Sequence, residues 1–123
     1  MNILNRFQNL VSNEILAVED LMRKQALGFN EDLQAALDHL ISSGGKRLRP
    51  NITLLVGKML KGEIERIITL AAAIELLHTA TLVHDDLIDG SLLRRGIPTL
   101  NSKWTPAATV LTGDFIFAKA AKL

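Results

Sequence analysis

Apolar residues recur at steps of three and four over residues 4–22, which is the period of an amphipathic helix. Gly28 ends this stretch. A second apolar stripe covers residues 33–41. Asn30 precedes it and suits a helix N-cap, since acidic residues follow in the favourable first turn. The segment Ser42-Ser-Gly-Gly45 ends the second stripe, so the pattern predicts two helices in this part of the chain.

Three further helices complete the predicted pattern. Pro50 suits the first turn of a third helix that stops near Gly62. Residues 63–89 predict a helix roughly 40 Å long, and its nearly continuous apolar surface predicts a central position. Residues 90–101 predict a loop, and Thr105-Pro106 predicts the start of a fifth helix. No strand alternation or internal repeat competes, so we expect an all-α bundle of about five helices.

The composition of the chain limits the classes of protein to which it can belong. The chain has 123 residues, enough for one small domain, and its 48% hydrophobic and 4% aromatic content predicts an aliphatic core. A net charge of +1 gives no general attraction to nucleic acid or membranes. With no cysteine there is no disulfide or thiolate metal site, and we expect a cytoplasmic protein. We expect neither a secretory signal nor a transmembrane segment, because polar residues interrupt the longest apolar stretch.

Three aspartates, Asp85, Asp86 and Asp89, end the long helix. The helix dipole disfavours acids at this end, and the like charges of Asp85 and Asp89 repel across one turn. His78 shares their face, whereas Asp86 is rotated by roughly 100°. A bound cation would offset both penalties, and carboxylate oxygens suit Mg²⁺. The alternative is a solvated acidic helix end, but the preceding apolar helix favours the metal site.

Two basic clusters accompany these acids. In Gly44-Gly-Lys-Arg-Leu-Arg-Pro50 the glycines permit close approach of a ligand to the backbone, and Lys46, Arg47 and Arg49 offer cations to phosphate oxygens. The glycine spacing and the lack of a preceding strand exclude a Walker loop. The second cluster, Arg94-Arg95, could neutralise the aspartates through salt bridges or could hold a diphosphate. An ordinary basic loop is the alternative for the first cluster.

Taken together, Gly44–Pro50, His78–Asp89 and Gly90–Thr99 resemble the N-terminal third to half of trans-polyprenyl diphosphate synthases. The resemblance covers almost the whole chain in order and spacing. It implies the N-terminal part of the isoprenoid-synthase helical bundle, with a central helix that ends in the Asp-Asp-x-x-Asp motif. It also implies a Mg²⁺-dependent, head-to-tail condensation of an allylic diphosphate with isopentenyl diphosphate.

The resemblance also implies roles for individual residues. The residues expected to bind isopentenyl diphosphate are Lys46, Arg49, His78 and Arg95. Those expected to hold Mg²⁺ at the allylic diphosphate are Asp85 and Asp89, assisted by Asp86, and Arg94 would contact that same diphosphate. In the family the released diphosphate takes the role of base, so we expect His84 to be a packed or supporting residue. The small Ala80 and Thr81 suggest a medium- or long-chain product.

The family carries a second aspartate-rich motif on a later helix, and residues 1–123 contain none. We therefore expect an incomplete synthase domain that is inactive alone, either as a truncated piece or as a subunit that needs a partner. Exposed apolar faces of half a bundle could also pair two copies into a homo-oligomer.

Two competing functions stay open at this point. A terpene cyclase or related Mg²⁺ lyase could also use an Asp-Asp-x-x-Asp helix end, but it needs no isopentenyl diphosphate site such as Gly44–Pro50. A non-catalytic or partner-dependent subunit of a heteromeric prenyl diphosphate synthase is the second alternative. Nucleic-acid binding is disfavoured, because the basic residues interleave with acids and lack stacking aromatics.

Overall fold

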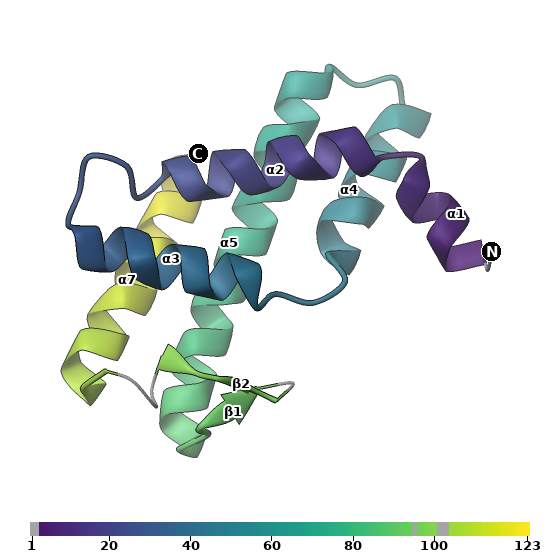
Figure 1. Cartoon of the computed structure of the whole chain (residues 1–123). Helices are drawn as coiled ribbons and strands as arrows, with labels where there is room; N and C mark the ends of the chain where they lie inside the picture. The colour runs from purple at the N-terminus through teal and green to yellow at the C-terminus, as the bar shows by residue number, and fades with distance from the viewer. Residues whose placement is uncertain (1–2, 95, 101–103) are drawn as a thin grey trace.

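The computed structural model describes residues 3–94, 96–100 and 104–123, and Figure 1 shows their arrangement. Helices dominate the described part, which confirms the all-α expectation. The helices are α1 (Ile3–Asn9), α2 (Ser12–Lys24), α3 (Glu31–Ser42), α4 (Leu48–Met59), α5 (Ile64–Asp89) and α7 (Pro106–Lys122). A small antiparallel hairpin joins β1 (Leu93–Arg94) to β2 (Ile97–Pro98).

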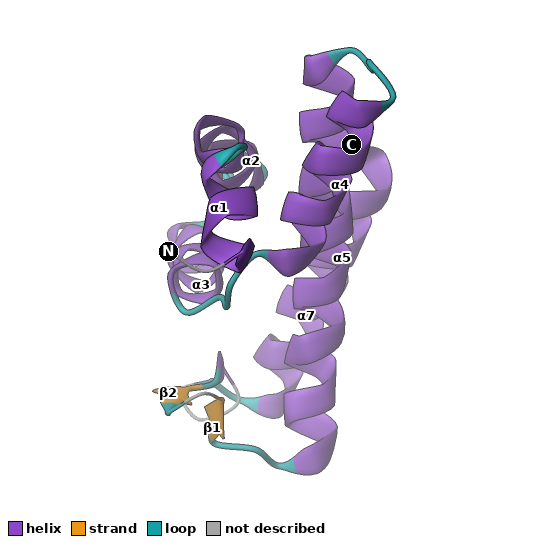
Figure 2. Cartoon of the chain, turned by 90° about the vertical axis from the view of Figure 1, so that its right-hand side faces the viewer, coloured by secondary structure: helices purple, strands orange, loops and turns teal. Residues whose placement is uncertain are grey.

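The helices form two layers. Figure 2 shows α4, α5 and α7 side by side, with α1, α2 and α3 in a second layer. Side chains from four helices meet fully buried between the layers: Met22, Leu54, Leu76 and Ile116. Burial of such aliphatic side chains stabilises the fold by about 1.5–3 kcal/mol each. The long apolar helix is therefore central, as its sequence predicts.

Local chemistry accounts for several helix ends. The Asn30 side chain accepts a hydrogen bond from the Asp32 N–H at 2.6 Å, and the Thr105 hydroxyl accepts one from the Ala108 N–H at 3.2 Å. Gly90 takes the left-handed conformation (φ 67°) that closes α5, which lets the Ser91 N–H reach the Asp86 carbonyl at 2.8 Å. These helix caps confirm the predicted starts of α3 and α7 and fix the turn that follows the aspartates.

Two expectations about elements are wrong. The single helix predicted over residues 4–22 is broken at a turn into α1 and α2, where Val11 is fully buried and Leu10 is exposed. The loop predicted over residues 90–101 contains the β1–β2 hairpin, in which Leu93 pairs with Pro98 and Arg94 with Ile97. Strands of two residues are too short to show an alternating pattern.

Among the described residues, α5 is long and apolar enough to cross a membrane by length and composition. However, 44% of its most apolar window is buried inside the fold, and α2, α4 and α7 pack on it. Those neighbours give α5 the environment of a core helix. This supports the expectation that the apolar stretch is a buried helix.

Candidate functional site

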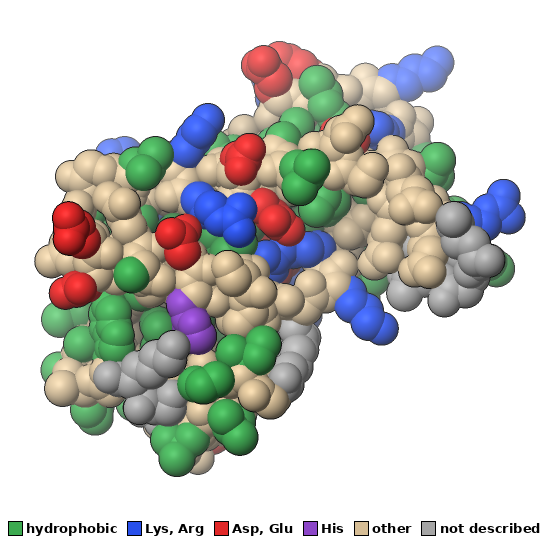
Figure 3. All heavy atoms as spheres, in the orientation of Figure 1, with side chains coloured by type: hydrophobic (Ala, Val, Ile, Leu, Met, Phe, Trp, Pro, Cys, Tyr) green, Lys and Arg blue, Asp and Glu red, His purple; other side chains and the backbone are tan. Residues whose placement is uncertain are grey.

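A cavity of about 360 Å³ lies between the loop before α4, the C-terminal half of α5 and the hairpin. Five of the predicted site residues line it, namely Lys46, Arg49, His78, Asp86 and Arg94. They come from four segments of the chain, and the fold brings them to one place. Figure 3 shows Lys and Arg side chains in the middle of this view, between α2 and α3 and beside Asp and Glu side chains. The cavity therefore has the cationic lining that an anionic ligand needs.

Arg49 and His78 are joined across the cavity. Arg49 lies in the first turn of α4, and its Nη1 is 3.2 Å from Nε2 of His78 on α5. Because a guanidinium can only donate, this hydrogen bond requires an unprotonated His78 Nε2. The contact holds both side chains at the cavity wall, where an anion could engage the other donors of Arg49.

Asp86 and Arg94 form the second polar pair of the cavity. Arg94 donates from Nε to both carboxylate oxygens at 3.1 and 3.0 Å, and from Nη2 to Oδ1 at 2.6 Å. Asp86 is 7% exposed. The pKa of Arg94 is raised, mainly because Asp86 accepts its hydrogen bonds, and the charges of Asp85 and Asp89 add to the effect. Arg94 is thus a fixed cation within electrostatic reach of all three aspartates.

Asp85 and Asp89 are exposed on the last turns of α5, outside the cavity lining. Among residues 3–94, 96–100 and 104–123, no three His, Cys, Asp or Glu side chains are grouped as they would be around a metal ion. Two carboxylates one turn apart nevertheless fit Mg²⁺, which takes one or two carboxylates and fills its shell with water and phosphate. The Asp86 carboxylate is occupied by Arg94, so Asp85 and Asp89 are the pair open to a cation. Their metal-binding role stays a prediction.

Arg95 lies outside the described residues, so its predicted contact with isopentenyl diphosphate stays a prediction. His84 connects two helices: its Nε2 is 3.2 Å from the Val110 carbonyl oxygen and 3.4 Å from Oδ1 of Asp114. A methyl group at Gly113 would come within 2.5 Å of the His84 ring. His84 is therefore packed between α5 and α7, as expected of a supporting histidine.

The two small residues linked to product length face different ways. Ala80 is buried in the core, whereas Thr81 is exposed. A ligand passing along the open face of α5 would therefore meet Thr81 rather than Ala80.

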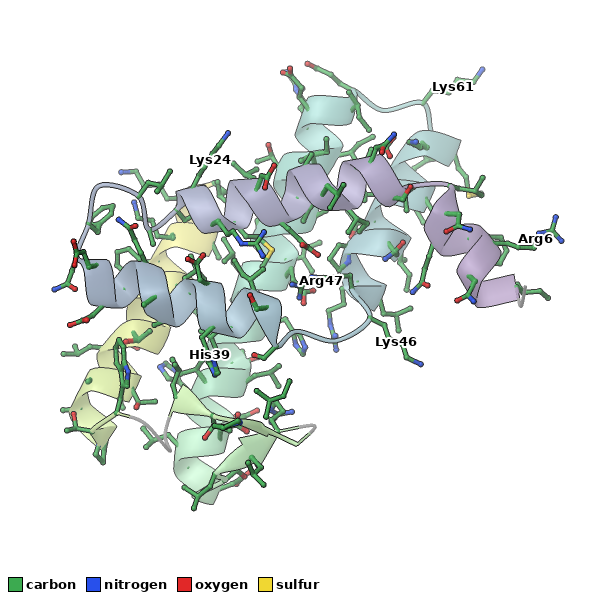
Figure 4. The ribbon with its side chains drawn as sticks, in the orientation of Figure 1. Arg6, Lys24, His39, Lys46, Arg47 and Lys61 are labelled. Atoms are coloured by element: carbon green, nitrogen blue, oxygen red, sulfur yellow. The ribbon has the colours of Figure 1, made fainter. Side chains whose placement is uncertain are left out.

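One arginine of the first basic cluster has a different environment from its neighbours. The Arg47 side chain is 9% exposed and forms ion pairs with Glu19 on α2 and Glu75 on α5. Figure 4 shows Arg47 directed in among the helices and Lys46 directed out from the loop. The sequence places Arg47 in the same cationic run as Lys46 and Arg49, and nothing local to that run indicates acids 28 residues away on each side. For that reason the sequence does not predict the buried group of Glu19, Arg47 and Glu75.

Comparison with known proteins gives two kinds of match, one to a family model and one to individual relatives. Residues 30–123 match the family model for polyprenyl synthetases. The chain is 38% identical over 117 residues to heptaprenyl diphosphate synthase component 2 of Geobacillus stearothermophilus, covering 95% of this chain and 37% of that protein. It is 37% identical over 123 residues to octaprenyl diphosphate synthase of Escherichia coli, covering 98% and 37%.

Solved structures agree. The polyprenyl synthase from Caulobacter crescentus CB15, complexed with calcium and isoprenyl diphosphate, gives a TM-score of 0.89 at 39% identity and covers 96% of this chain and 36% of that one. A decaprenyl diphosphate synthase from Rhodobacter capsulatus gives a TM-score of 0.88 at 37% identity, covering 96% and 37%. The chain therefore spans a little over a third of the length of these relatives. It belongs to the polyprenyl synthetase family of transferases and has the N-terminal part of their all-α fold.

Proposed function

We propose that this chain forms part of a prenyl diphosphate synthase, which condenses an allylic diphosphate with isopentenyl diphosphate in a Mg²⁺-dependent reaction. The observation that carries the proposal is the convergence of Lys46, Arg49, His78 and Arg94 on one cavity. These side chains come from the loop before α4, from α4, from α5 and from β1. Basic residues that only face solvent need not come together around one cavity, as these do.

The diphosphate of isopentenyl diphosphate is proposed to bind Lys46, Arg49 and His78, together with Arg95. Lysine offers a mobile point charge and arginine a planar fork, and both match phosphate oxygens. The His78 contact with Arg49 keeps the guanidinium at the cavity wall before the ligand arrives. Such preorganisation lowers the cost of ordering the side chains on binding.

The allylic diphosphate is proposed to lie at the aspartate end of α5. Asp85 and Asp89 would hold Mg²⁺ there, and Asp86 would assist by fixing Arg94 against that diphosphate. The metal would supply charge stabilisation for the leaving diphosphate. A relative crystallised with calcium and isoprenyl diphosphate supports the use of a divalent ion together with a diphosphate ligand.

The proposed reaction needs charge stabilisation and positioning from this chain rather than a protein base. The allylic C–O bond breaks, the double bond of isopentenyl diphosphate attacks the allylic carbon, and the departing diphosphate takes the proton that is lost. Arg94 stabilises negative charge on the leaving group, and Lys46 and Arg49 hold the second substrate in place. We further propose a medium- or long-chain product and a cytoplasmic location.

A partner-dependent subunit is the second candidate function. A heptaprenyl diphosphate synthase relative is named component 2, and the chain covers 37% of it. Under this proposal the chain contributes the cavity described above, and another polypeptide supplies the rest of the site. The chain alone would then bind substrate without turning it over.

Calorimetric titration of the chain with isopentenyl diphosphate tests the proposal directly. We expect Arg49→Ala to weaken binding by about tenfold or more, since a charge-assisted contact is lost. Lys24→Ala, at an exposed position on α2, is the matched control that removes an equal charge elsewhere. Asp85→Asn should instead weaken Mg²⁺-linked binding of an allylic diphosphate. Equal losses for Arg49→Ala and Lys24→Ala would contradict a specific diphosphate site.

A further inference from the structure

We infer that Arg47 is a positioning residue for the loop that carries Lys46 and Arg49, and that it is not itself a ligand of the diphosphate. The inference concerns the proposed isopentenyl diphosphate site and rests on the proposed function for that ligand. Its evidence is the geometry of the Arg47 side chain and backbone, which differ from those of both neighbouring cations.

Each nitrogen of the Arg47 guanidinium has a partner on a different helix. Nε donates to Glu19 Oε1 on α2 at 3.1 Å, and Nη2 donates to the Ile41 carbonyl at the end of α3 at 2.5 Å. Nη1 lies 3.6 Å from Glu75 Oε1 on α5. The planar fork of an arginine can serve three such partners at once, whereas a lysine ammonium cannot match their directions. One side chain therefore ties the loop to three helices.

The backbone of Arg47 is constrained as well. Its φ of 56° is left-handed, a conformation that non-glycine residues adopt rarely and at a free-energy cost. Its carbonyl oxygen accepts hydrogen bonds from the backbone N–H of Asn51 at 3.0 Å and from the Asn51 side chain at 2.8 Å. Both the backbone and the side chain of Arg47 therefore hold the turn between Lys46 and Arg49 in place.

We call Arg47 and its partners Glu19, Ile41 and Glu75 the Arg47 clamp, and Gly44 leaves room for it. A Cβ at Gly44 would lie 2.8 Å from Cζ of Arg47, too close for the guanidinium to keep its place. A side chain at Gly44 would thus displace the buried guanidinium of Arg47, independently of any ligand approach. This contact is a second sign that the clamp is a built feature of the loop.

Charge separates Arg47 from its neighbours. Two carboxylates, Glu19 and Glu75, face one guanidinium, so the cluster carries no spare positive charge for an anion. Glu75 is 7% exposed and also lines the cavity. The negative charge of a carboxylate in the wall of an anion site disfavours anion binding. The presence of Glu75 there is explained if its function is to hold Arg47.

The test compares Arg47→Gly with Lys61→Gly. Both variants replace an arginine or lysine at a left-handed position (φ 56° and 57°) with the residue that adopts this conformation most easily. Any difference between them therefore reports on the lost side chain and not on backbone strain. Arg47→Gly should weaken isopentenyl diphosphate binding by about tenfold, and Lys61→Gly should leave it unchanged.

The sign of the effect at Glu75 distinguishes positioning from direct binding. Removal of a carboxylate beside an anion should strengthen binding if charge alone matters. A positioning role predicts that Glu75→Gln weakens binding, and that Glu19→Gln, which changes a more exposed side chain, weakens binding as well. Tighter or unchanged binding in both variants would overturn the inference.

Hydrogen exchange of the backbone amides of residues 44–49 gives a readout that needs no ligand. Exchange should accelerate in Arg47→Gly and stay at the wild-type rate in Lys61→Gly, with circular dichroism showing retained helix in both. Unaltered exchange in Arg47→Gly refutes positioning whether or not the wild-type chain binds isopentenyl diphosphate. A wild-type chain that shows no binding contradicts the proposed function instead.

Discussion

At the scale of single residues, Arg94 shows how structure joins two readings of one sequence motif. The sequence allows Arg94 either to neutralise an aspartate or to hold a diphosphate. In the structure it bonds Asp86 through Nε and Nη2 and also lines the cavity. The salt bridge therefore orients a cation that still faces the site. The sequence marks both Asp86 and Arg94 as site residues. Only the position of the hairpin relative to the end of α5 shows that their side chains meet.

The Glu14–Lys58 pair predicts a pH dependence of folding. The Glu14 carboxylate pairs with Lys58 and links α2 to α4. The hydrogen bond from Lys58 is the main cause that lowers the pKa of Glu14 below 4.5 in the folded chain. A lowered folded pKa adds stability that is present above the unfolded pKa and is lost as the pH falls through the folded value.

Glu14→Gln should therefore lower the melting temperature near neutral pH and flatten its decline in acid. Thermal unfolding followed by circular dichroism from about pH 7 to about pH 3 measures both effects. Glu65→Gln, at an exposed position in the first turn of α5, is the matched control. If both variants show the wild-type acid slope, the pair contributes no pH-dependent stability.

At the scale of elements, the sequence predicts best what local chemistry decides. The Asn30 and Thr105 caps and the αL glycine at position 90 each act within a few residues. The apolar stripe continues through the break between α1 and α2, so the helical period of the sequence does not reveal it. The partners of Arg47, Glu19 and Glu75, lie far along the chain, so no local pattern reveals them. The hairpin pairs residues close in sequence, but its two-residue strands are too short to show a pattern.

The contact of α4 with α5 predicts that Gly57 is sensitive to substitution by a larger residue. A Cβ at Gly57 would lie 2.7 Å from Cγ2 and 2.8 Å from Cδ1 of Ile67, which is 7% exposed. Overpacking costs about 1–3 kcal/mol, and the better helix propensity of alanine offsets about 0.5–1 kcal/mol of it. Gly57→Ala should therefore destabilise the chain by about 1 kcal/mol in urea unfolding.

A double-mutant cycle checks the cause of that loss. Ile67→Ala removes Cγ1, Cγ2 and Cδ1, the three atoms that a Cβ at Gly57 would meet, so the double variant should be more stable than the sum of the single changes predicts. Strict additivity would show that the Gly57 effect does not arise from this contact.

At the scale of the whole molecule, the exposed surface of α5 and α7, here called the outer face, carries several large apolar side chains. Leu70, Leu77 and Ile88 recur at helical spacing along α5, and Leu111 and Phe117 are exposed on α7. Soluble monomers rarely leave large apolar patches open to water. The chain also spans a little over a third of its relatives, so in those proteins most of the polypeptide lies beyond the segment that this chain matches.

The last prediction concerns this face. We expect the isolated chain to self-associate, because pairing two such faces removes apolar side chains from water. Leu77→Glu or Phe117→Glu should shift light-scattering masses from an oligomer towards the monomer, because each places a charge in the contact. Ile52→Glu, which changes a side chain of similar exposure on α4, should leave the oligomer intact. A folded wild-type monomer at high concentration would contradict self-association, and it would leave the face available to a partner polypeptide that completes the proposed synthase.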